Sequence, residues 1–206
     1  TFKLRKNSTW SNGTPVTAHD FEYSWKRTLT PETAAEYSYI MADIVGSSTK
    51  EIQENGVDGA GVKALDDYTL EVKLNRPVAY FAELVSFQVF FPQNQAFVES
   101  CGDAYGSAAD KQLYNGPFTL TSWKMEDQFT MEKNPNYWDA ANVKLNKINT
   151  KVVKDTGAEV SLYEDGQIDR AILSSDYVDK YKDSKEFHTR DVASVFMLQV
   201  NGGNNK

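Results

Sequence analysis

The sequence predicts an α/β fold, on three observations. The chain contains two kinds of segment in alternation. In one kind, apolar residues recur every three to four positions, as in helices; in the other, apolar residues occupy every second position, as in strands. Of the 206 residues, 40% are hydrophobic and 13% aromatic, which is enough to build a buried core. No internal repeat and no low-complexity tract interrupts this pattern.

The first quarter of the chain predicts a strand followed by a capped helix. Residues 2–5 alternate apolar and charged side chains, which is typical of a half-buried strand. Thr17 is expected to cap a helix, with Asp20 completing a variant capping box, and Pro31 should end that helix. Its predicted buried face consists of Ala18, Phe21, Trp25 and Leu29.

The rest of the chain predicts hairpins first and alternating units afterwards. Residues 33–56 are expected to form short helical pieces, and residues 62–74 a hairpin turning at Asp66 and Asp67. A Gly-, Ala-, Ser- and Asp-rich segment at 101–115 is the predicted boundary between two sub-regions. The other expected elements are helices at 77–86, 93–100, 156–165 and 176–182, a hairpin at 117–133 turning at 125–127, and strands at 147–153, 169–173, 186–191 and 194–201.

Charge and hydropathy argue against two classes of partner. The 22 basic and 29 acidic residues give a net charge of −7, and no basic cluster is present. Binding to nucleic acid or to an anionic membrane surface depends on clustered Lys and Arg, so neither is expected. The most apolar segment, residues 77–92, is interrupted by Glu83, Ser86 and Gln88, and we assign it to the core.

Candidate catalytic and metal-binding residues are few and scattered. His19 and His188 fall on different predicted elements, and Cys101 is the only cysteine, which also rules out an internal disulfide. The acidic pairs Asp66–Asp67 and Glu126–Asp127 fall at predicted hairpin tips, where short polar residues favour turns. The sequence therefore predicts no enzymatic activity, no cofactor and no metal site.

The ends of the sequence suggest a part of a longer protein. It begins without Met inside a predicted strand and stops at residues 201–206, and it contains neither a secretory signal nor a lipobox cysteine. We therefore expect further segments on both sides.

Five ordered segments carry a resemblance to a known family. They are residues 2–6 with 10–27 (WSNGTPVTAHDFEYSWKR), 61–72 (GVKALDDYTLEV), 114–118 (YNGPF) with Trp123, 132–139 (EKNPNYWD) and 162–169 (LYEDGQID). Together they resemble family 5 extracytoplasmic solute-binding proteins over essentially the whole chain. The ending at residues 23–27 (YSWKR) is more similar to the oligopeptide-binding branch than to the dipeptide or nickel branches.

The resemblance implies a class II periplasmic-binding-protein-like fold, present here in part. Residues 1–95 would form the small additional lobe, and residues 96–206 part of the first main lobe. The other main lobe, which in the family carries an aspartate for the peptide amino terminus, would follow Lys206. The four tryptophans are expected to pack inside the lobes, with Trp138 large enough to anchor a lobe core.

The resemblance also implies a peptide-binding site between lobes. Tyr37 matches a tyrosine of the small lobe at the cleft, with Tyr39 as a competitor because the local chain is one residue shorter. Ser194 stands where some Gram-negative relatives carry a disulfide cysteine, which favours a Gram-positive source. The implied peptide-contacting residues are Tyr37, Tyr39, Leu173, Ser174, Ser175 and Met197, which can offer hydrogen bonds or adaptable apolar contact.

The implied function is that of the substrate-binding component of an ABC importer, which captures oligopeptides and delivers them to the permease subunits. The implied setting is extracytoplasmic, as a monomeric Gram-positive surface lipoprotein rather than a periplasmic protein, anchored to the membrane only by a lipid outside this chain. Alternatives are the same fold binding a peptide pheromone, a nickel chelate or a sugar, a peptidase whose catalytic residues lie outside the sequence, and a surface adhesion or signalling protein.

Overall fold

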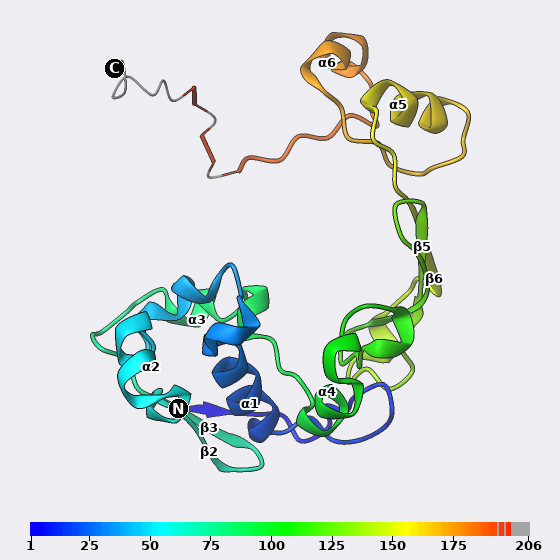
Figure 1. Ribbon diagram of the computed structural model, residues 1–206. Helices are drawn as coiled ribbons and strands as arrows, with labels where there is room; N and C mark the ends of the chain where they lie inside the picture. Colours follow the sequence, from blue (N-terminus) through cyan, green and yellow to red (C-terminus); the bar gives the residue numbers. More distant parts are fainter. Residues whose placement is uncertain (193, 196, 199–206) are drawn as a thin grey trace. The chain divides into compact units, whose positions relative to one another are not determined.

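The computed structural model of the protein describes residues 1–192, 194–195 and 197–198. The chain divides into two compact units, Thr1–Val152 (unit 1) and a second that begins at Val153 (unit 2) (Figure 1). Each unit is described by itself below.

The structure is a mixture of helices and strands, as the sequence predicts. The strands are β1 (Phe2–Lys3), β2 (Val62–Asp66), β3 (Thr69–Val72), β4 (Phe118–Lys124), β5 (Gln128–Lys133) and β6 (Lys147–Lys151). The α-helices are α1 (Ala18–Leu29), α2 (Thr49–Asn55), α3 (Phe81–Leu84), α4 (Gln95–Cys101), α5 (Thr156–Glu164) and α6 (Ser175–Tyr181). Short 3₁₀ segments join them: η1 (Pro31–Thr33), η2 (Ser38–Asp43), η3 (Val57–Gly59), η4 (Gln88–Phe90), η5 (Gly102–Ala104), η6 (Ala109–Lys111) and η7 (Ala140–Asn142).

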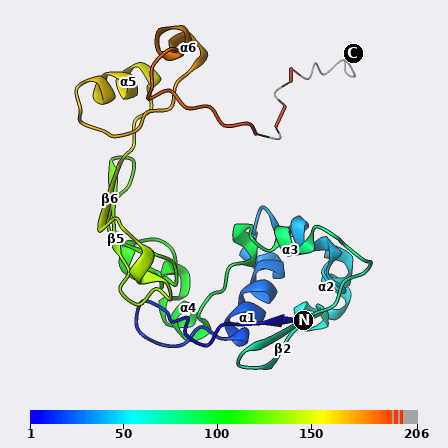
Figure 2. The same ribbon diagram turned by 180° about the vertical axis from the view of Figure 1, so that it is seen from behind.

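The first sheet is antiparallel with strand order β1-β3-β2, and α1 packs against it (Figure 2). Leu70 of β3 lies opposite Phe2 on one side and Ala64 on the other. The hairpin turns at Asp66 and Asp67, as predicted, and the Asp66 carboxylate accepts a hydrogen bond from the Tyr68 amide at 2.8 Å. The acidic pair at this tip therefore shapes a turn.

Helix α1 begins and ends where its sequence signals predict. The Asp20 carboxylate accepts the Thr17 amide at 2.8 Å, which satisfies a donor that the first turn leaves unpaired. Ala18, Trp25 and Leu29 of the predicted apolar face are buried, while Phe21 is half-buried. Pro31, which lacks an amide hydrogen, begins η1 two residues after the helix.

The hydrophobic core of unit 1 lies between α1, the first sheet and the segment that carries α3 and η4. The Trp25 ring meets the Phe90 ring edge-on, with centroids 5.0 Å apart, and its Nε1 donates to the Phe90 carbonyl at 2.8 Å. This contact satisfies the one polar atom of the buried indole. The buried cluster consists of Ala18, Trp25, Leu29, Met41, Ile44, Ile52, Ala60, Val62, Ala64, Leu70, Phe81 and Phe90.

The second sheet is also antiparallel, with strand order β4-β5-β6. Its hairpin turns at residues 125–127, as predicted, and Glu126 adopts a left-handed φ of 58° in that turn. The register shifts between Leu120 and Ser122, which marks a β-bulge.

Two of the four tryptophans do not pack as predicted. Trp10 and Trp25 are buried, at 2% exposure each, but Trp123 and Trp138 are both 41% exposed. Trp123 lies near the turn of the second hairpin, and the Trp138 ring is covered on one face by the Arg5 guanidinium. The prediction that Trp138 anchors a lobe core is therefore wrong in this structure, because its covering partner is a charged side chain at the surface.

Unit 2 consists of α5 and α6 with their connections. Glu164 at the end of α5 accepts hydrogen bonds from Lys180 Nζ (2.6 Å) and the Tyr181 hydroxyl, both on α6. The strands predicted at 169–173 and 186–191 are not formed, because neither segment has a hydrogen-bonded neighbouring strand among the described residues. Half of the strand predicted at 194–201, residues 196 and 199–201, lies outside the described residues.

The predicted lobe boundary stays a prediction. The first sheet ends at Val72 and the second begins at Phe118, so no sheet formed by the described residues runs through both regions, and residues 101–115 lie between the two sheets. The more compact division falls later, between Val152 and Val153. The assignment of 1–95 and 96–206 to separate lobes of a larger protein rests on the resemblance alone.

Candidate ligand-binding surface

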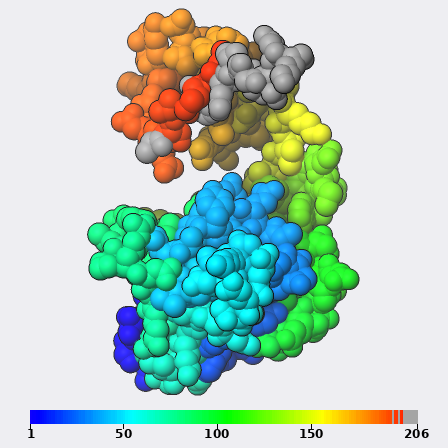
Figure 3. Space-filling view, turned by 60° about the vertical axis from the view of Figure 1, so that its left-hand side comes forward, coloured from blue at the N-terminus to red at the C-terminus, as the bar shows by residue number. Residues whose placement is uncertain are grey.

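Tyr37 and Tyr39 lie together on the surface of unit 1. Tyr37 precedes η2 and Tyr39 lies within it, and their ring centroids are 6.2 Å apart. The Phe87 ring meets Tyr37 edge-on at 5.3 Å, so the three rings form one exposed group, which we call the aromatic cluster. Figure 3 shows the η2 region in blue beside the blue-green segment that carries α3 and η4. Tyr39 is the most exposed of the three, at 69%.

Asp43 fixes the segment that brings Phe87 to the tyrosines. Its carboxylate accepts hydrogen bonds from Arg76 Nε at 3.0 Å and from the Tyr80 hydroxyl at 3.1 Å. The Asn75 amide hydrogen bonds to the Asp43 carbonyl at 2.9 Å. The hydrogen bond and the negative charge of Asp43 also raise the pKa of the Arg76 guanidinium above its ordinary value. These contacts of Asp43 hold the segment that leads to Phe87 against η2.

Phe87 was missed by the sequence reasoning. It falls in the apolar segment 77–92, which as a whole predicts core, and Phe81 and Phe90 of that segment are indeed buried. Phe87 and Phe91 are instead exposed at 37% and 55%. Short helical turns place alternate rings inside and outside, and this cannot be resolved from so uniformly apolar a segment.

The predicted loop Leu173–Ser174–Ser175 lies in unit 2 at the start of α6. Ser174 precedes the helix as its N-cap residue and Ser175 is its first residue, while Leu173 is half-buried. The Ser174 hydroxyl oxygen is buried and has no hydrogen-bond partner among the described residues. The Glu159 carboxylate of α5 accepts the Ile172 amide at 3.0 Å and so fixes the entry to this loop.

Met197 is 76% exposed and lies outside any helix or strand. The structure therefore brings Tyr37 and Tyr39 together in unit 1, and places Leu173, Ser174 and Ser175 consecutively in unit 2. That these residues contact one ligand stays a prediction.

The candidate catalytic and metal-binding residues remain apart. Within the described ranges no group of three or more His, Cys, Asp or Glu could hold a metal ion. His19 pairs with Asp67 at 3.5 Å on the surface, with side chains 61% and 67% exposed. His188 is exposed, and Cys101 is a half-buried free thiol.

None of the helices in the described part of the chain has the length and apolar character needed to cross a membrane.

The family comparison covers the whole sequence. Residues 1–206 match the model of the bacterial extracellular solute-binding proteins, family 5 Middle. The chain belongs to this family. A curated relative, the oligopeptide-binding protein OppA of Bacillus subtilis, is 35% identical over an alignment that covers 98% of this chain and 38% of the relative. The family 5 chain thus spans well under half the length of that relative.

Solved structures agree with this membership. The substrate-binding domain of an oligopeptide ABC transporter from Bacillus anthracis is 48% identical, with a TM-score of 0.85 over 89% of this chain and 36% of that one. Listeria monocytogenes OppA bound to peptide is 44% identical, with a TM-score of 0.84 over the same shares. These similarities confirm the predicted fold class, a partial, mixed α/β structure of the periplasmic-binding-protein type.

Proposed function

We propose that this chain forms part of the peptide-capturing surface of an ABC importer's substrate-binding protein. The observation that carries the proposal is the likeness to Listeria monocytogenes OppA, a structure bound to peptide, at 44% identity. The protein would capture oligopeptides between lobes and deliver them to permease subunits without chemical change. It would act outside the cytoplasm as a monomeric lipoprotein of a Gram-positive surface.

The aromatic cluster suits this role physically. A receptor for varied peptides gains affinity from backbone hydrogen bonds, common to all peptides, and from rigid apolar surfaces that accept many side chains. Tyr37 and Tyr39 offer ring faces and hydroxyl groups, and Phe87 adds an apolar edge. Serine hydroxyls of the 173–175 loop are proposed to supply further hydrogen bonds, and Met197 an adaptable contact.

Replacement of Tyr37 by Ala should weaken peptide binding by the full-length gene product about tenfold or more. The change removes one ring and leaves the Tyr39 and Phe87 rings without their shared neighbour, and an aromatic contact of this kind contributes about 0.5–1.5 kcal/mol beyond its buried area. Calorimetry with a defined pentapeptide measures the effect, and mass spectrometry of the recovered ligand checks that the peptide is not cleaved.

The matched control is Trp123→Ala, which removes an aromatic side chain with the same 41% exposure as Tyr37 from the second sheet. That variant should bind peptide as the unmodified protein does. Equal affinity of Tyr37→Ala and the unmodified protein would remove the aromatic cluster from the site, and a hydrolysed peptide would favour the peptidase alternative.

A further inference from the structure

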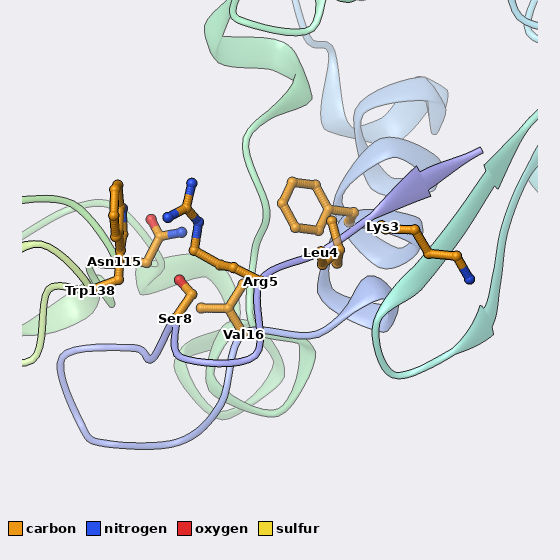
Figure 4. Close-up of a pocket in the computed structure, with 8 residues that line it drawn as sticks. Lys3, Leu4, Arg5, Ser8, Val16, Asn115 and Trp138 are labelled. Carbon is orange, nitrogen blue, oxygen red and sulfur yellow. The ribbon is translucent and has the colours of Figure 1, made fainter.

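A cavity of about 520 Å³ opens in unit 1, away from the aromatic cluster. Its wall combines an apolar part with polar and cationic side chains (Figure 4). The lining residues are Lys3, Leu4, Arg5, Ser8, Val16, Phe21, Asn115 and Trp138, and no Asp or Glu is among them. We call it the Arg5 pocket.

The Arg5 guanidinium is held in place but not neutralised. Its central carbon lies 3.6 Å from the centroid of the Trp138 ring, a cation–π contact that fixes the plane of the charged group. No carboxylate of the described residues pairs with it. Lys3, the second cation of the wall, donates one hydrogen bond from Nζ to Thr69 Oγ1 of the first sheet at 2.7 Å.

Two neutral polar groups stand beside the guanidinium. Neither the Ser8 hydroxyl nor the Asn115 amide has a side-chain hydrogen-bond partner in the described part of the chain. Figure 4 shows both side chains on the same side of the pocket as Arg5 and Trp138. Three donors without protein partners therefore converge on one cavity, next to the apolar side chains Leu4, Val16 and Phe21.

The surrounding backbone is fixed, so the pocket does not depend on a loose loop. The Ser11 amide donates to the Tyr114 carbonyl at 2.6 Å, and the Tyr114 amide donates to Ser11 Oγ at 3.2 Å. Thr9 Oγ1 donates to the Asn136 carbonyl, and Asn136 Nδ2 returns a hydrogen bond to the Ser11 carbonyl, both at 2.9 Å. These four bonds tie the segment of Ser8 to the segments of Asn115 and Trp138.

We propose that the Arg5 pocket binds a small organic carboxylate with an apolar body. A planar guanidinium matches a carboxylate through two parallel hydrogen bonds, and this geometry is lost when the carboxylate is converted to an amide. Ser8 and Asn115 would donate to the remaining oxygen lone pairs, and the apolar wall would cover the body of the ligand. The inference does not rest on peptide transport.

The test uses 3-phenylpropionate and its neutral amide as probes on the full-length gene product. Calorimetry should show the carboxylate binding at least tenfold more tightly than the amide, because only the former pairs with Arg5. Arg5→Gln should abolish this preference, whereas Arg190→Gln, which removes the same charge from an exposed position in unit 2, should keep it.

A second pair of probes, a tripeptide with a free carboxyl terminus and its amidated form, shows whether the bound carboxylate comes from a peptide terminus or from a free acid. Tighter binding of the free form, lost in Arg5→Gln, would identify the carboxylate as a peptide terminus, and tight binding of 3-phenylpropionate alone would identify a free acid. Equal affinity for 3-phenylpropionate and its amide, or a preference that survives in Arg5→Gln, overturns the proposal. A structure of the full-length protein in which an acidic side chain from another segment fills the Arg5 pocket would also overturn the proposal.

Discussion

Asp20 is a carboxylate inside unit 1, 7% exposed, at the first turn of α1. Besides the Thr17 amide it accepts Trp10 Nε1 at 3.3 Å. Burial raises the pKa of Asp20 above its ordinary value, while the hydrogen bonds from Thr17 and Trp10 act in the opposite direction without cancelling the effect. One residue thus joins the helix start to a buried tryptophan.

The raised pKa predicts a pH dependence opposite to that of most carboxylates. The folded protein binds the Asp20 proton more readily than the unfolded chain, so the contribution of Asp20 to stability is largest at acid pH and falls as pH rises through its folded pKa. Asp20→Asn does not titrate. As the pH is lowered from 7 to 4, the free energy of unfolding of the unmodified protein should therefore increase relative to that of Asp20→Asn.

Urea unfolding of both proteins at several pH values measures the difference, in which the titration of all other groups cancels. If the unmodified protein instead loses stability relative to Asp20→Asn as the pH falls, the fold stabilises Asp20 as an anion and the prediction is wrong.

At the scale of elements, the sequence predicts the helix bounds and hairpin turns that are set by hydrogen bonds between neighbouring residues. Thr17, Asp20 and Pro31 set the bounds of α1, and turn-forming residues set both hairpin tips. What could not be predicted depends on distant partners. Trp138 is covered by Arg5, 133 positions earlier in the sequence (138 − 5), and Phe87 reaches Tyr37 from another element. Residues 169–173 have a strand-like sequence, but the described part of the chain offers no neighbouring strand to pair with them.

The turn between η2 and α2 gives a sharp test of backbone requirements. Gly46 has φ +70°, and a Cβ placed there would lie 2.9 Å from the Gly59 carbonyl carbon, with the carbonyl oxygen closer still. Gly46→Ala should destabilise unit 1 by about 2–4 kcal/mol, since it adds a steric clash to the strain of a left-handed backbone.

Gly13→Ala is the matched control, because Gly13 also has a positive φ of +86° but no atom within 4 Å of the added methyl group. It should cost about 1 kcal/mol. Thermal or urea unfolding compares the two variants, and equal losses of stability would show that the close approach of Gly59 has no energetic consequence.

At the scale of the molecule, the fold class and family could be predicted, because five separated segments occur in the family's order. The site residues stay predictions. Tyr37 and Tyr39 lie in unit 1, Leu173–Ser175 and Met197 in unit 2, and sequence gives no measure of the geometry that would join them around a ligand. The chain also spans 38% of the length of its Bacillus subtilis relative.

This share predicts that the 206-residue chain alone binds peptide far more weakly than the full-length gene product. An enclosed ligand loses the hydrogen bonds of every missing wall, and one charged hydrogen bond contributes about 1.5–3 kcal/mol, or roughly tenfold to a hundredfold in affinity. Calorimetry on both proteins, with the same pentapeptide, measures the ratio. Comparable affinities would place the complete site within these 206 residues.

The stack of Arg5 on Trp138 has an optical consequence. Two of the four indoles, those of Trp10 and Trp25, are buried, while those of Trp123 and Trp138 are exposed to solvent. Of the two exposed indoles, Trp138 has a guanidinium against its ring face. If the proposed carboxylate binds Arg5, the fluorescence emission of Trp138 is therefore expected to change, and this change would report the occupancy of the Arg5 pocket.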